Sequence, residues 1–191
     1  MISPEWKLLG GLLLLAAAPG QAEDHGGFGR ALELPAHRAL VELREKPDTV
    51  QIRFESDGCS GGLSEVWRLG AERFPGFAKV HESAPPWESC CVIHDRAYYD
   101  GAEAPDAETS FDARLEADRR LELCVAEMGV SRRDELAEIY GIRPDQVETA
   151  YSTIGSAMFW AVRFGGGPCT GLPWRWGFGF PDCSVLAAKQ D

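Results

Sequence analysis

Apolar residues recur at helical spacing in three long stretches of the chain. These stretches cover residues 86–101, residues 110–128 and residues 144–164. A proline begins the first and third stretches, and Ser110 or Asp112 is placed to cap a helix in the second. In all three stretches, a glycine follows the last apolar position. Proline in the first turn and glycine at the end are typical helix boundaries. The pattern therefore predicts three long helices, the second ending at Gly129.

The intervening segments are shorter and less regular. Residues 23–34 are Gly-rich and predicted to be mobile, whereas residues 35–46 are predicted to form a short helix that begins at Pro35. Apolar residues alternate over 47–54, which indicates an extended segment or a short strand. Residues 63–86 are rich in aromatic residues and are interpreted as a satellite core rather than a lid. Residues 131–140 are predicted to form a separate surface helix.

The first 22 residues have the pattern of a secretory signal. An apolar run from Leu8 to Ala18 is followed by a helix breaker and small residues, with the cut expected after Ala22. The run is too short to span a bilayer comfortably. The sequence thus predicts a signal peptide at 1–22, a protein secreted or delivered to the periplasm, and a single domain at 23–191.

Length and charge narrow the class of protein. The chain has 191 residues, of which 45% are hydrophobic, which is enough for one domain with a real core. Its formal net charge is −11. Nucleic acid is therefore not an expected partner, and strongly anionic membranes would not attract the chain electrostatically.

The stretch from Cys90 to Tyr99 carries the most unusual combination of side chains. On a helix turning about 100° per residue, Cys90, Cys91, His94, Asp95 and Tyr98 share a face roughly 140° wide. Such groups are costly to bury unless they are bonded to something. His94 and Asp95 are adjacent and point in different directions, so they can serve neighbouring sites. This arrangement suits a hydrolase in which a carboxylate holds a cation and an imidazole moves protons.

A Gly-rich loop precedes this helix. Residues 56–62 read Ser-Asp-Gly-Cys-Ser-Gly-Gly, a tight loop whose carbonyls can point inward. Calcium takes backbone carbonyl and carboxylate oxygens, and Asp57 offers one carboxylate. The loop by itself is a weak signal, because most Gly-rich turns bind nothing.

Six cysteines in an exported chain are expected to form disulfides. They are Cys59, Cys90, Cys91, Cys124, Cys169 and Cys183, and fifteen pairings are possible. A zinc site built from Cys90, Cys91 and His94 is the competing interpretation.

These motifs resemble secreted phospholipase A2. The resemblance lies in Cys-Cys-x-x-His-Asp-x-x-Tyr at 90–98, in the loop before it, and in an Asp six residues before a Cys, here Asp118 and Cys124. The Phe-Asp-Ala start of the second helix and the run Ala-Val-Arg-Phe at 161–164 are closest to the bacterial and fungal branch. The resemblance covers about residues 54–165. The disulfide-closed aromatic tail at 166–191 has no counterpart in it.

The resemblance implies a mainly α fold. Two long antiparallel helices would carry the site, a third would pack against them, and the Gly-rich loop would bind calcium. It also implies the pairs Cys59–Cys91 and Cys90–Cys124, which leaves Cys169–Cys183 to close the tail. If Cys90 bonds Cys124, His94 lies about 6 Å from that bond along the first helix and Asp118 about 9 Å from it along the second. In an antiparallel pair these displacements point in the same direction, which allows a hydrogen bond between the two side chains.

The resemblance further implies calcium-dependent hydrolysis of the sn-2 ester of glycerophospholipids. His94 would act as the general base, Asp118 would orient it, and Tyr98 would steady the pair. Asp95 would bind Ca²⁺ with loop oxygens from Asp57, Gly58, Ser60 and Gly62. The expected partner is phospholipid at a membrane or micelle interface, with no obligate protein partner. The alternative is a catalytically silent, secreted lipid- or protein-binding module on the same scaffold.

Overall fold

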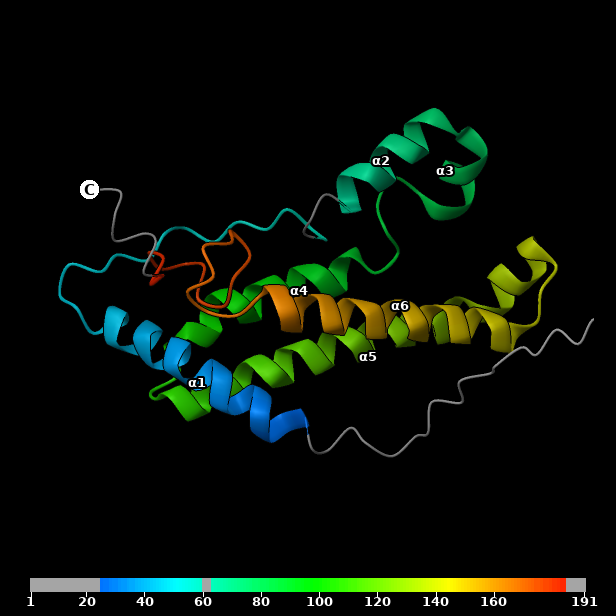
Figure 1. The fold of residues 1–191 in the computed structure, drawn as a ribbon. Coiled ribbons are helices and arrows are strands. Elements are labelled where there is room, and N and C mark those ends of the chain that lie inside the picture. Colours follow the sequence, from blue (N-terminus) through cyan, green and yellow to red (C-terminus); the bar gives the residue numbers. More distant parts are fainter. Residues whose placement is uncertain (1–24, 60–62, 185–191) are drawn as a thin grey trace, which may run out of the picture.

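The computed structural model describes residues 25–59 and 63–184. Over these residues the chain is mainly helical, with six α-helices, one 3₁₀ turn and no strand. The predicted signal peptide lies outside the described residues, as do loop residues 60–62 and the last seven residues. Figure 1 shows a long helical body with a helical hairpin, α2 (Leu63–Arg73) and α3 (Pro75–His81), standing out from one side of it.

The body is built on α4 (Glu88–Asp100), α5 (Ala107–Tyr140) and α6 (Pro144–Gly165). The helices α5 and α6 run antiparallel beside each other, and α4 lies along the first half of α5 (Figure 1). The side chain of Asp106 caps α5 by accepting a hydrogen bond from the amide of Thr109 at 2.7 Å. A cap of this kind satisfies one of the amides that a helix start leaves unpaired.

Two disulfides join these helices to the loop that precedes them. Cys90 of α4 bonds Cys124 of α5, and Cys59 bonds Cys91, so the end of the loop is held against α4. A third bond, Cys169–Cys183, closes the segment after α6. All three predicted pairs are confirmed, and since every cysteine is used, the zinc interpretation based on free thiols is wrong.

The buried apolar residues form two clusters. The first surrounds the disulfides Cys59–Cys91 and Cys90–Cys124 and includes Trp87, Leu121, Val125 and Tyr151. The second lies under the closed tail, where Trp176 packs against Tyr98 with ring centroids 5.1 Å apart. The hairpin α2–α3 joins the first cluster through Trp67, whose ring meets Trp87 edge-on at 5.5 Å. This contact fits the interpretation of residues 63–86 as a satellite core.

The first helix differs from the prediction. It runs as α1 (His25–Arg44), so it covers residues expected to be mobile, and Pro35 lies inside it rather than at its start. Proline removes one backbone donor within a helix and is costly there. Tertiary contacts override that preference, because Arg30 pairs with Asp112 of α5 and Glu33 pairs with Arg114 and Arg163.

The second long helix also differs. It does not stop at Gly129 but continues through the predicted surface helix to Tyr140, and Gly141, in the left-handed region at φ 62°, ends it. A Cβ on Gly129 would lie 2.3 Å from the Cβ of Tyr151 in α6. The glycine is therefore explained by the close approach of two helices and not by a helix end.

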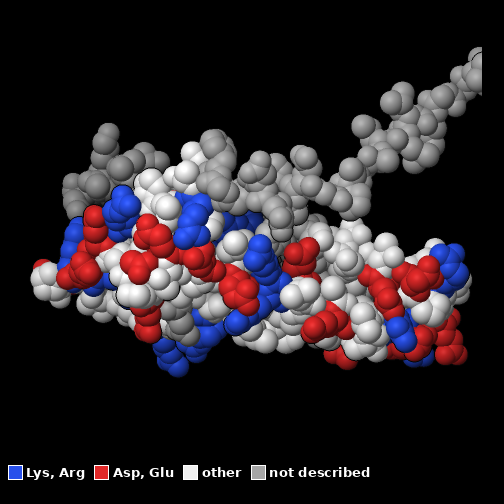
Figure 2. All heavy atoms as spheres, turned by 90° about the horizontal axis from the view of Figure 1, so that it is seen from below, with Lys and Arg blue, Asp and Glu red and all other residues white. Residues whose placement is uncertain are grey.

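The remaining predictions on elements hold more closely. Residues 47–48 lie in a turn, and residues 49–54 form neither helix nor strand. The amide of Ile52 donates to the carbonyl of Gly179 at 2.8 Å, which ties this segment to the closed tail. In the two described stretches, no helix is long and apolar enough to cross a membrane. Figure 2 shows acidic and basic side chains interspersed over the face seen from below, so the net negative charge is spread and not gathered there.

Candidate functional site

His94 and Asp118 meet between α4 and α5. The Nε2 atom of His94 lies 3.0 Å from Oδ1 of Asp118, a contact that the spacing of the two residues from their disulfide allows. Asp118 is fully buried and His94 is 6% exposed. A carboxylate only accepts hydrogen bonds, so Nε2 carries a proton, and whenever the ring is neutral its lone pair lies on Nδ1.

Asp118 is held by two further donors. The hydroxyl of Tyr98 donates to Oδ1 at 2.7 Å, and a guanidinium nitrogen of Arg163 donates to Oδ2 at 2.9 Å. Burial raises the pKa of Tyr98 well above its usual value, so the phenol remains protonated and serves as a donor. His94, Tyr98 and Asp118 form a fixed, hydrogen-bonded group, which we call the histidine cluster.

A cavity of about 230 Å³ opens beside His94. Apart from His94 and Asp95, its walls are apolar or disulfide side chains. They are Cys59, Cys91, Leu121, Met158, Ala161, Val162 and Trp174. A hydrocarbon chain lying against these walls would leave its polar end near the imidazole.

Asp95 faces a second, adjoining cavity. This cavity is about 370 Å³ and shares Asp95 and Trp174 with the first. The hydroxyl of Ser56 donates to Oδ2 of Asp95 at 2.6 Å. Burial raises the pKa of Asp95 and the charge of Asp57 raises it further, while the Ser56 hydrogen bond and His94 act in the opposite direction. Two carboxylates that disfavour each other's charge would both be relieved by a bound cation.

Residues 56–59 of the Gly-rich loop are held close to the carboxylate of Asp95. Gly58 adopts a left-handed φ of 80°, and a Cβ there would lie 2.8 Å from oxygens of Ser64 and Glu88, so only glycine fits. Its amide donates to Ser56 Oγ at 3.2 Å. The glycine therefore lets the chain turn tightly beside Asp95.

The donor set of this second cavity fits a hard cation in part. Glu55, Ser56, Asp57 and Asp95 all line it and offer oxygen atoms, which calcium prefers. Among the described residues, no three acidic, histidine or cysteine side chains gather closely enough to hold a metal by themselves. A cation here would also need backbone carbonyls or water. Two of the predicted ligands, Ser60 and Gly62, lie outside the described residues.

The sequence interpretation missed several residues around the site. It did not assign a role to Arg163 or to Trp174, and it did not consider Glu33 or Arg114. A sequence signal existed for Arg114, since it shares the apolar face of its helix with Leu121 and Val125, where a charge requires a partner. The signal for Glu33 was weak, because only His37 lies close in sequence, four residues away, while its two arginine partners are 81 and 130 residues away.

Comparisons of this chain with protein-family models, with curated proteins and with solved structures found no match.

Proposed function

We propose that this protein is a secreted, calcium-dependent ester hydrolase of the phospholipase A2 type. The observation that carries the proposal is the buried Asp118–His94 pair, which opens on an apolar cavity and adjoins a carboxylate-lined one. The antiparallel α4 and α5, linked by Cys90–Cys124, with the loop tied to α4, support a phospholipase A2-like fold.

In the proposed reaction, His94 accepts a proton from water at Nδ1. The water oxygen attacks the carbonyl carbon of the sn-2 ester, and the proton then passes to the glycerol oxygen as the acyl bond breaks. Asp118 keeps Nε2 protonated, orients the ring and stabilises the imidazolium that forms. Tyr98 donates to the same carboxylate oxygen and so restrains its position.

The two cavities suit the acyl chain of such a substrate and the cation. The apolar walls beside His94 would bury the acyl chain, and the adjoining acidic cavity would receive the cation. Asp95 and Asp57 would hold Ca²⁺ together with loop oxygens, and bound calcium would polarise the ester carbonyl and stabilise the developing oxyanion. The expected partner is phospholipid at a membrane or micelle surface.

Export is part of the proposal. Three disulfides join all six cysteines, as is usual in oxidising compartments, and the described residues hold no membrane-spanning helix. Secretion or delivery to the periplasm would place the protein where its proposed substrate is accessible.

The test is fatty acid release from a phosphatidylcholine that carries different acyl chains at sn-1 and sn-2. We expect the sn-2 acid to be released with calcium, and release to stop with a chelator or in His94→Gln. Release that persists in His94→Gln would overturn the mechanism. Binding to vesicles with no acid released from either position would instead identify the silent lipid-binding module.

A further inference from the structure

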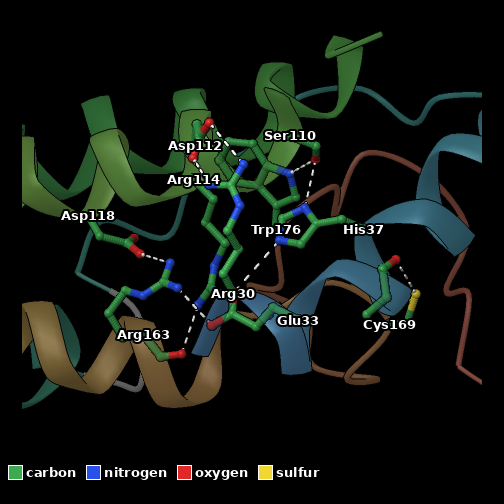
Figure 3. A network of polar contacts seen from close by, with 12 residues as sticks. Arg30, Glu33, His37, Ser110, Asp112, Arg114, Asp118, Arg163, Cys169 and Trp176 are labelled. Atoms are coloured by element: carbon green, nitrogen blue, oxygen red, sulfur yellow. Dashed lines mark hydrogen bonds and ion pairs between the residues drawn. The ribbon is translucent and has the colours of Figure 1, made fainter. Parts of the chain in front are cut away.

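Asp118 is tied to a second group of charges on the side away from His94. One guanidinium nitrogen of Arg163, in α6, donates a hydrogen bond to Oδ2 of Asp118, and another donates to Oε1 of Glu33 at 2.7 Å. Arg114 of α5 contacts Oε2 of the same Glu33. Glu33 thus divides its two oxygens between two arginines (Figure 3). We call Glu33, Arg114 and Arg163 the arginine clasp.

The clasp also reaches the histidine cluster by a second route. Arg114 is fully buried, and its Nε donates to the Tyr98 hydroxyl at 3.2 Å. One of its terminal nitrogens donates to the carbonyls of Val162 and Arg163 at 2.7 and 2.9 Å, near the C-terminus of α6. A cation is favourable at that end of a helix. Both donors that flank Asp118, Tyr98 and Arg163, are therefore themselves positioned by the clasp.

The charges of this group balance. Asp118 and Glu33 carry two negative charges and the two arginines carry two positive ones, so the four charges cancel while His37, 3.7 Å from Glu33, is neutral. Arg114 and Asp118 are fully buried, and the side chains of Arg163 and Glu33 are 10% and 23% exposed. Removing the charge of Glu33 leaves one guanidinium uncompensated. Arg163 would then be free to turn both nitrogens toward Asp118, because a forked guanidinium prefers a bidentate carboxylate. That movement would compete with His94 and Tyr98 for Oδ1.

We propose that Glu33, which lines neither of the two cavities at the site, is its positioning residue. Because its carboxylate is divided between Arg114 and Arg163, Arg163 can reach only one oxygen of Asp118. The other oxygen is left for His94. The helix α1 is thereby coupled to the catalytic base. The proposal rests on the proposed function only for its kinetic readout, because the state of His94 can be observed without substrate.

The first measurement uses Glu33→Gln, which keeps the shape and removes the charge. On a short-chain phosphatidylcholine dispersed as monomers, we expect kcat to fall between about 10- and 100-fold, as small misplacements of a catalytic group do, with KM nearly unchanged. Glu33→Asp, which restores the charge on a shorter side chain, should recover part of the loss.

The matched control is Asp112→Asn. Asp112 also pairs α5 with α1, through Arg30, but this pair is largely exposed and touches neither the clasp nor the histidine cluster. If the effect of Glu33 came only from docking α1, the control would lose a similar amount of activity. We expect it to retain wild-type kcat, and an equal loss in Asp112→Asn would overturn the proposal.

The second measurement is nitrogen NMR of ¹⁵N-histidine-labelled protein, with His94→Gln used for assignment. In the wild type, we expect the neutral His94 ring to carry its proton on Nε2, and in Glu33→Gln we expect the Nδ1–H form to become populated. An unchanged His94 tautomer in Glu33→Gln would overturn the proposal. Should Glu33→Gln fail to fold, Glu33→Asp gives the same test in weaker form: its shorter side chain holds Arg163 less firmly, so the Nδ1–H form should be populated to a smaller extent, and an unchanged tautomer there would likewise overturn the proposal.

The two measurements separate this inference from the proposed function. A wild-type protein that releases no fatty acid would refute the proposed hydrolysis, while the NMR comparison would still decide whether Glu33 controls His94.

Discussion

Replacing Asp118 by asparagine tests the central group of the site. The new side chain has the same shape, but an amide group that donates takes the place of one of its two oxygens. In the native protein, Oδ2 of Asp118 accepts from Arg163, while Oδ1 accepts from His94 and Tyr98. The remaining oxygen must face Arg163, since two donors facing each other would leave the guanidinium unpaired. The amide then faces His94 and Tyr98.

The consequence for His94 follows from hydrogen-bond chemistry. A ring nitrogen facing an amide donor must accept, so Nε2 loses its proton and Nδ1 gains it. The lone pair needed to take a proton from water is then turned toward the substituted side chain and away from the cavity. In serine proteases, the wrong tautomer produced by an equivalent change lowers kcat by about 10⁴, and we expect a loss of about that size here.

The assay combines fatty acid release with calcium titration and thermal unfolding. We expect calcium binding to be unchanged, because Asp118 does not line the carboxylate-lined cavity, and stability to fall by about 1–3 kcal/mol from the unpaired buried groups. Asp112→Asn on the same helix breaks only a largely exposed ion pair, so it should leave the stability nearly unchanged. Near wild-type kcat in folded Asp118→Asn would refute the assignment of Asp118 as the orienting group.

Two other predictions concern the neighbouring carboxylate and the buried histidine of α1. Asp95→Asn should weaken calcium binding by removing a charged oxygen ligand, whereas His94→Gln should keep the calcium affinity and lower the hydrolysis rate by about 10²–10⁴. Calorimetry measures the calcium affinity and fatty acid release measures the rate. Equal calcium affinities in the wild type and both variants would contradict the assignment of Asp95. His37 is fully buried, and burial lowers its pKa below the ordinary value of 6.5, so folding favours the neutral form. The stability of the protein should therefore fall as the pH drops below 6.5, because the unfolded chain binds a proton that the folded one does not. The melting temperature measured against pH should decrease less in His37→Gln than in the wild type, and identical curves would contradict this reasoning.

Local signals in the sequence were sufficient for some of the elements and for the central pair of the site. Helical periodicity with proline and glycine boundaries predicted α4 and α6 to within a few residues. The spacing of Asp118 and His94 from the Cys124–Cys90 pair predicted that they lie level with each other, and their 3.0 Å contact confirms it. In each case a fixed rise per residue or a covalent link converts sequence distance into spatial distance.

Features that depend on partners distant in sequence emerge only in the folded chain. Pro35 and Gly129 look like helix boundaries, yet both lie inside helices, because packing and ion pairs across α1, α5 and α6 outweigh local preference. Glu33 becomes important only once α1 folds across α5 and α6 and brings Arg114 and Arg163 to one carboxylate. No local pattern encodes that meeting, since the cost of burying each charge is removed only by the others.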